Sequence, residues 1–198
     1  RNAVEANPTT PIMDPKDPSL YYNFKGQAAG YNPLELLKKD KSTGTTKLLD
    51  WDGTVKLNLL PLLLNKEDRQ TLTTQLTFAD HQYDNYNQWF RPSTSTLAIN
   101  AGREGEASQD YSKSAIRTLE WVTNYANSFG NHNFKVMAGY SYQYEQYSGL
   151  NAANKDFPND ALEDNNLGSG TYAKDEGELG MGSYKNDSKL ISFFGRVS

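Results

Sequence analysis

Apolar and polar residues alternate along several segments of the chain, and this alternation predicts β-strands. Near Leu49 the first such segment begins, where Val55 and Leu57 fall on one side while Thr54 and Lys56 fall on the other. Successive side chains of a strand point to opposite faces, whereas a helix would spread these residues around its axis. Strands are predicted near residues 49–60, 69–86, 112–128, 134–147 and 189–198.

The connections between the predicted strands alternate between short and long. A short turn is predicted at residues 129–133, where Gly130 and Asn131 tolerate positive φ. Long loops are predicted at residues 7–47, 87–111 and 148–188, and Pro33 favours one short helical turn over residues 33–38. The pattern indicates an all-β fold of antiparallel up-and-down strands, with turns at one end and long loops at the other.

The apolar side of these strands is predicted to face lipid. Backbone amides in hydrocarbon find no water, so strands cross a membrane only within a closed barrel. These strands are too few to close one, since single-chain barrels begin at about eight strands. The chain is therefore predicted to form part of a larger outer-membrane β-barrel. The alternative is a soluble β-sandwich, whose strands also alternate. The lipid-facing residues are predicted to be Val55, Leu57, Leu72, Leu76, Phe78, Leu119, Trp121, Phe134, Val136, Tyr140, Tyr142, Tyr144, Ile191 and Phe193.

Composition reduces the number of functions that the chain could have. The net charge of −4 provides no basic field for nucleic acid, so no nucleic-acid partner is expected. Cysteine is absent, which excludes disulfides and thiolate metal sites. The sequence contains no apolar run of about 20 residues, the length that a membrane helix needs. It also opens without a signal-peptide pattern, and we expect a longer precursor.

Candidate chemistry is sparse. Asp50 and Asp52 share a strand face and are interpreted as lumenal or solvated charges, while His81 and His132 are expected at opposite ends of the sheet. We therefore expect no catalytic residue, no cofactor and no metal site, and we interpret the chain as not an enzyme. One loop could hold Ca²⁺ through oxygen ligands, but it lacks the spacing of a calcium-hand loop and is interpreted as solvated acids: Asp156, Asn159, Asp160, Glu163 and Asp164.

A substrate-binding site is predicted at Tyr83, Tyr86 and Trp89. Flat rings stack on sugar faces, and the amides of Asn87 and Gln88 between them pair with hydroxyls. The alternative is that these rings belong to an aromatic girdle or pack within a loop.

Several short motifs, in order along the chain, resemble the SusC/RagA family of outer-membrane transporters. The hairpin motifs are FGNHN at 129–133 and VMAGYSYQ at 136–143. Flanking motifs are ANPTTPIM at 6–13, NPL at 32–34, FPND at 157–160, NNLG at 165–168 and SFFGRV at 192–197. Each motif is weak alone, and the ordered set is more specific.

The resemblance implies a barrel of about 22 strands filled by a plug domain. It also implies location in the bacterial outer membrane, a SusD-like surface lipoprotein as partner, energy supplied through the TonB complex, and uptake of glycans or peptides. The plug and the TonB box are expected outside this chain. Two alternatives remain open: a soluble all-β carbohydrate-binding module, and a passive porin or adhesin barrel.

Overall fold

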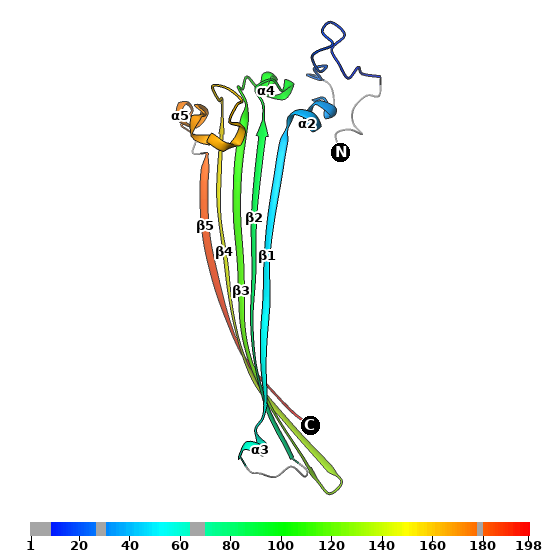
Figure 1. Cartoon of the computed structure of the whole chain (residues 1–198), viewed down its shortest axis with the longest axis vertical. Helices are drawn as coiled ribbons and strands as arrows, with labels where there is room; N and C mark the ends of the chain where they lie inside the picture. Colours follow the sequence, from blue (N-terminus) through cyan, green and yellow to red (C-terminus); the bar gives the residue numbers. More distant parts are fainter. Residues whose placement is uncertain (1–8, 27–30, 64–69, 178–179) are drawn as a thin grey trace. The chain divides into compact units, whose positions relative to one another are not determined.

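The computed structural model describes residues 9–26, 31–63, 70–177 and 180–198. One antiparallel sheet with the order β1-β2-β3-β4-β5 forms its framework, so each strand pairs with its neighbours in sequence (Figure 1). This confirms the predicted all-β, up-and-down fold. The strands are β1 (Lys41–Asn58), β2 (Gln70–Arg91), β3 (Glu106–Phe129), β4 (His132–Lys155) and β5 (Met181–Val197).

Short helices occupy the connections: α2 (Pro33–Lys39), α3 (Leu60–Leu63), α4 (Thr96–Asn100), the 3-10 helix η1 (Glu163–Ser169) and α5 (Tyr172–Asp175). The predicted helical turn is confirmed in α2, where Pro33 is the first residue and the Asn32 side chain accepts hydrogen bonds from the N–H groups of Leu34 and Glu35. No helix in the described ranges combines the length and apolarity that crossing a membrane would require.

The strands are longer than predicted at the end that carries the long connections. β1 begins at Lys41 instead of near 49, and β3 begins at Glu106 instead of near 112. β4 extends to Lys155, and β5 starts at Met181. The added residues include many Ser, Thr, Asn and Gly, which are typical of loops, but strand pairing decides their conformation. The predicted loops 87–111 and 148–188 are therefore too long, and the connections run from 92 to 105 and from 156 to 180.

Cross-strand contacts hold one register along the sheet. Thr54 lies opposite Thr77 on β1 and β2, with hydroxyl oxygens 3.1 Å apart. β3 and β4 are joined by the two-residue turn Gly130–Asn131, in which Gly130 has φ 60°. On β4 and β5, Lys135 and Ser198 exchange both backbone hydrogen bonds, at 2.8 and 2.9 Å. In the same register, the N–H of Ala153 on β4 donates to the carbonyl of Gly180, the residue before β5.

The chain divides into two compact units, each built from several segments. The loop unit comprises Arg1–Thr45, Asn85–Tyr111 and Gly149–Ser183, and the sheet unit comprises Thr46–Asp84, Ser112–Ser148 and Tyr184–Ser198. In the loop unit, Phe90, Ala107 and Phe157 form a small buried cluster against which Leu167 packs. In the sheet unit, most described side chains are exposed or half-buried.

β1 and β5 are the edge strands of this sheet, and β1 is exposed along its whole length. An edge strand presents a row of backbone N–H and C=O groups that can pair with a further strand. Both edges are therefore suited to continuation by other strands.

Candidate functional site: the two faces of the sheet unit and the contacts of the loop unit

Apolar side chains gather on one face of the sheet unit. The rings of Trp51 and Phe78 lie 5.1 Å apart across β1 and β2, and those of Tyr140 and Phe193 lie 5.2 Å apart across β4 and β5. Side chains alternate along each strand and the strands keep one register, so the same face continues across the sheet. Alternation along the strands places on this apolar face the residues predicted to face lipid, and lipid contact itself stays a prediction: Val55, Leu57, Leu72, Leu76, Phe78, Leu119, Trp121, Phe134, Val136, Tyr140, Tyr142, Tyr144, Ile191 and Phe193.

Polar groups on the apolar face pair with one another. The indole N–H of Trp121 donates to the hydroxyl of Thr74 at 2.6 Å, and the hydroxyl oxygens of Thr74 and Thr123 are 3.0 Å apart. An unpaired hydroxyl or indole N–H is costly in an apolar medium, so this pairing makes the face compatible with hydrocarbon. Sequence patterns did not reveal it, because the three residues come from two strands.

Aromatic residues mark two limits of the apolar face. Along β4, Phe134 stands at one limit and Tyr144 at the other, with Val136, Ala138, Tyr140 and Tyr142 between them in the same register. The separation of these limits matches the roughly 9–11 residues of a tilted membrane-spanning strand. Aromatic rings at such limits are typical of the two membrane–water interfaces of an outer-membrane barrel.

The opposite face of the sheet unit is polar. On β1 it carries Asp50, Asp52 and Lys56, as predicted from alternation. Asp50 contacts the Nδ1 atom of His81 at 3.0 Å. One face of the sheet thus carries acids, amides and hydroxyls, and the other carries apolar side chains. This pattern is typical of a barrel strand that separates lipid from water.

Glu145 is the centre of a polar group on β4 and β5 of this polar face. It accepts hydrogen bonds from Gln143 at 2.5 Å, Ser188 at 3.4 Å and the hydroxyl of Tyr147 at 3.5 Å. Tyr147 is exposed and was missed by the sequence analysis, although its alternation with Glu145 and Gln143 could have placed it on this face.

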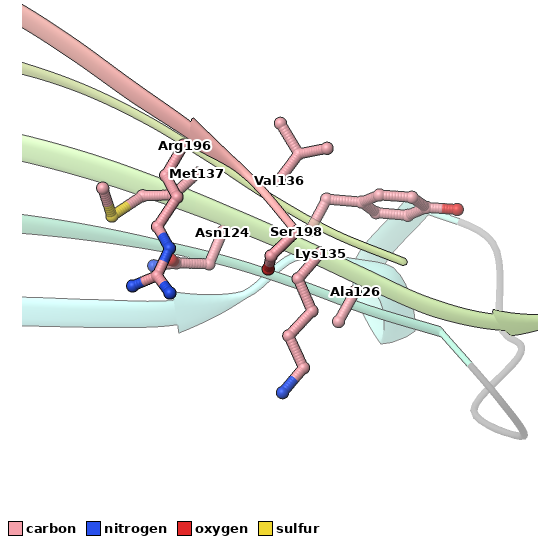
Figure 2. A pocket seen from close by; sticks show the side chains of 8 residues that line it. Asn124, Ala126, Lys135, Val136, Met137, Arg196 and Ser198 are labelled. Carbon is pink, nitrogen blue, oxygen red and sulfur yellow. The ribbon is translucent and has the colours of Figure 1, made fainter. Parts of the chain in front are cut away.

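A hollow lies near the turn end of the polar face. Figure 2 shows the side chains of Lys135 and Arg196 extending to one side of the strands, while Val136 points to the other. Asn124 lies beside the two cations, and Ala126, Met137 and Ser198 complete the part of the hollow on this face. The view shows directly the alternation that separates the two faces.

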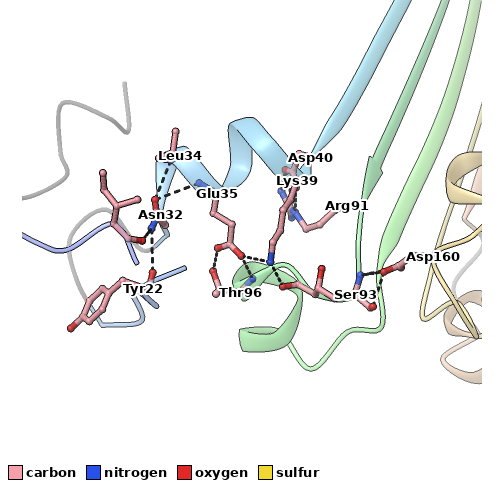
Figure 3. Close-up of polar contacts among 12 residues, drawn as sticks. Tyr22, Asn32, Leu34, Glu35, Lys39, Asp40, Arg91, Ser93, Thr96 and Asp160 are labelled. Atoms are coloured by element: carbon pink, nitrogen blue, oxygen red, sulfur yellow. Dashed lines mark hydrogen bonds and ion pairs between the residues drawn. The ribbon is translucent and has the colours of Figure 1, made fainter. Parts of the chain in front are cut away.

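The loop unit contains a chain of ion pairs across neighbouring strands. The guanidinium of Arg91 donates to Asp40 at 2.8 Å and to Glu106 at 3.1 Å, and Lys155 approaches Glu106 at 3.7 Å (Figure 3 shows the Asp40 contact). Because opposite charges alternate from the start of β1 to β4, each charge has a partner despite little exposure. This arrangement ties the ends of four strands together.

A buried carboxylate attaches α2 to the β2–β3 connection. Glu35 is 0% exposed and accepts hydrogen bonds from both the backbone N–H and the hydroxyl of Thr96, and it forms an ion pair with Lys39 at 3.0 Å (Figure 3). Thr96 is the first residue of α4, where unpaired N–H groups favour an acceptor. Asn32, also buried, donates to the carbonyl of Ile12 at 2.8 Å, so the preceding segment is held as well.

The loop acids have protein partners, whereas the sequence analysis interpreted them as solvated. Their partners, given as pairs, are Asp156 with Arg103 at 3.1 Å, Asp160 with the Ser93 hydroxyl at 2.8 Å, Glu163 with Lys41, and Asp164 with Gln88 at 2.7 Å. These pairs fold the β4–β5 connection against residues of β1, β2 and the β2–β3 connection. Within the described ranges, no cluster of three or more acidic or histidine side chains is placed to hold a metal ion.

Tyr172 of α5 contacts two cations through its ring. The Arg103 guanidinium is 4.0 Å from the centre of its ring, and the Lys155 amine is 4.9 Å away. Desolvation lowers the pKa of Arg103, but the hydrogen bond and charge of Asp156 outweigh it, so the pKa lies above its ordinary value. The guanidinium therefore stays charged and keeps both contacts.

The predicted binding residues separate along β2. Alternation places Tyr83 and Trp89 on one side of this strand and Tyr86 on the other. Tyr83 is exposed, whereas the ring of Trp89 lies 4.8 Å from the Arg91 guanidinium. The three side chains therefore do not line one surface.

No family model matches the chain. The chain is similar to a TonB-dependent receptor. It is 34% identical over 109 residues to TonB-dependent receptor P3 of Formosa agariphila, and the aligned segment covers 55% of this chain. That segment is 10% of the relative, so the chain corresponds to a small part of its length. The similarity supports the TonB-dependent receptor family in general.

Proposed function

We propose that this chain is part of the barrel wall of a TonB-dependent outer-membrane transporter of the SusC/RagA type. The observation that carries the proposal is the collection of apolar side chains on one face of a single up-and-down sheet. The similarity to a TonB-dependent receptor supports the same proposal. The chain acts as wall and vestibule and catalyses no reaction.

The apolar face is exposed in this chain, and lipid or another protein surface must cover it. Phe193 is 80% exposed and Val55 is 60% exposed on this face. Apolar surface costs about 25 cal/mol per Å² in water, and a continuous patch of this kind is found where lipid or protein covers it. Lipid meets this need without a second layer of protein, while strands outside this chain pair with the edges of β1 and β5 and close the barrel.

The polar face then lines a water-filled interior, and the loop unit belongs to the outer vestibule. Import of glycans or peptides, a SusD-like lipoprotein at the outer mouth and energy from the TonB complex follow from the resemblance of the hairpin and flanking motifs. The machinery for plug movement lies in other parts of such a transporter. The part played by this chain is to form the passage and contact the substrate.

Tyr83 is the substrate contact that the geometry favours among the three predicted residues. It is exposed, alternation places it on the polar face, and a flat ring of this kind can stack on a sugar face. Tyr86 points to the other side of β2, and substrate contact is therefore not proposed for it.

The decisive experiment places a charge on each face of one strand in the full-length protein. Val55→Arg puts a cation on the apolar face, and Thr54→Arg puts the same charge on the polar face one residue away. Near the bilayer midplane, Arg on the lipid side costs about 2–4 kcal/mol. We expect Val55→Arg to reduce the heat-modifiable, folded fraction in outer-membrane preparations, while Thr54→Arg folds like the wild type.

Equal behaviour of these two variants would refute the assignment of faces. If the full-length protein also remained in aqueous solution without detergent, the soluble carbohydrate-binding module would replace the transporter.

A further inference from the structure

A group of cations lies on the apolar face at its Tyr144 limit and beyond it. This cationic band consists of Lys47, Lys113, Arg117, Lys185 and Lys189. All of its members belong to the sheet unit and come from β1, β3 and β5.

Contacts confirm that the band shares a face with the apolar residues. The Lys189 amine lies 5.9 Å from the centre of the Tyr144 ring. Arg117 shares the register of Trp121 on β3 and meets Asp80 at 3.7 Å, a residue in the register of Phe78 on β2. Lys47 and Lys185 follow by alternation from Trp51 on β1 and from Lys189 on β5.

Charge in this region is positive, although the chain as a whole is negative. The acids on the same part of the face are Asp80, Asp84 and Asp187, so five cations exceed three acids by two, whereas the whole chain carries −4. Two acids are engaged with band members, since Asp80 pairs with Arg117 and Asp84 with Lys113, each at 3.7 Å. Lys47, Lys185 and Lys189 are exposed.

The cations are confined to one limit of the apolar face. Between Phe134 and Tyr144, the described apolar-face positions of all five strands carry no charged side chain. Next to Phe134, the face continues with Tyr125 and Asn127 on β3 instead of lysine or arginine. Strand order places the Tyr144 limit toward the long connections and the Phe134 limit toward the two-residue turn.

We propose that the cationic band binds phosphate-bearing lipid head groups of the outer leaflet. This inference rests on the proposed membrane function. Trp51 and Tyr144 would lie at the level of the interface, where amphipathic rings are stable. Lysine side chains a few residues further along the strands reach the charged head groups while their methylene stems remain on apolar surface. Positive charge at this limit alone matches a leaflet whose phosphate-bearing head groups carry net negative charge.

The test uses the full-length protein in nanodiscs of phosphatidylcholine that contain a small fraction of lipid A. The number of lipid A molecules retained after transfer to detergent is measured by native mass spectrometry. The triple variant Lys47→Gln, Lys185→Gln, Lys189→Gln removes exposed charge from the band. The matched control Lys56→Gln, Lys135→Gln, Arg196→Gln removes the same charge from the polar face.

We expect the band variant to lower lipid A retention by about tenfold, since each lysine near a charged membrane surface contributes measurably to binding. The control variant and the wild type should retain it equally, and dephosphorylated lipid A should be retained poorly by both. Unchanged retention in the band variant, an equal loss in the control, or equal retention of the dephosphorylated lipid would overturn the proposal.

Heat-modifiable mobility separates this inference from the proposed function. If the wild-type protein shows no folded, membrane-inserted form, the transporter proposal itself fails. If all three proteins fold and insert alike but retain lipid A alike, the lipid site alone is wrong.

Discussion

The indole N–H of Trp121 donates a hydrogen bond to the hydroxyl of Thr74, 2.6 Å away on the neighbouring strand. Thr74 also lies 3.0 Å from the hydroxyl of Thr123, so one threonine serves two polar groups on an otherwise apolar face. In water such contacts would exchange readily with solvent. In hydrocarbon no water can replace these hydrogen bonds, so the side chains depend on one another as partners.

The loss of stability on removing the Thr74 hydroxyl should therefore depend on whether water or hydrocarbon surrounds it. Thr74→Val in the full-length protein leaves the indole N–H and the Thr123 hydroxyl without their partner, and we expect a loss of about 1–2 kcal/mol in unfolding free energy. Thr77→Val is the matched control, because Thr77 pairs with Thr54 at 3.1 Å on the polar face, where water can replace it. Urea unfolding in lipid vesicles measures both. A loss as large for Thr77→Val would show that the two faces meet the same medium.

Acidic substitutions at neighbouring positions of β4 probe the same two faces. Tyr140→Asp places a carboxylate on the apolar face, and Ser141→Asp places it on the polar face. We expect the first to impair assembly more, with a cost below the about 2–4 kcal/mol of a basic residue. The heat-modifiable fraction of each variant, compared with the wild type, gives the answer. Indistinguishable fractions would count against the face assignment.

Gly139 provides room for an aromatic ring on the polar face. A Cβ atom at this position would lie well inside van der Waals contact with the ring of Phe194 on β5. We expect Gly139→Val to destabilise the protein by about 1–3 kcal/mol because the ring must move. Gly53→Val should be tolerated, since no atom lies within 4 Å of its added Cβ. Thermal unfolding in detergent compares them, and the double variant Gly139→Val, Phe194→Ala should recover part of the loss. No recovery would mean that the ring is not the obstacle.

Substrate contact can be tested with two tyrosines of one strand. Tyr83→Ala removes an exposed ring from the polar face, whereas Tyr86→Ala removes a ring that points to the other side of β2. We expect the first to weaken substrate binding by about five- to tenfold, a typical value for one stacked aromatic ring. The second should leave binding unchanged. Isothermal titration with the transported glycan or peptide measures the difference, and a larger effect from Tyr86→Ala would reverse the assignment.

The sequence was sufficient for the features that depend on local pattern. Alternation around Val55 and Tyr140 predicted both strands and faces, and Pro33 predicted α2. Tyr83, Tyr86 and Trp89 are close in sequence, but Tyr86 lies on the other side of β2 because residues three apart on a strand face opposite ways. Substrate contact by these residues stays a prediction. The partners of the loop acids could not be predicted, since Asp160 and Ser93 are separated by 67 residues in sequence, and Glu163 and Lys41 by 122.

The single register shared by β4 and β5 has a genetic consequence. Loss of one codon before Phe193 in β5, or before Tyr140 in β4, would move every later side chain of that strand to the opposite side, so that these rings would face water while Arg196 or Glu145 would face hydrocarbon. Loss of two codons preserves the alternation and shortens the strand by one repeat. In-frame length variation among natural variants should therefore occur in pairs of residues within the strands, and without that restriction in the long connections.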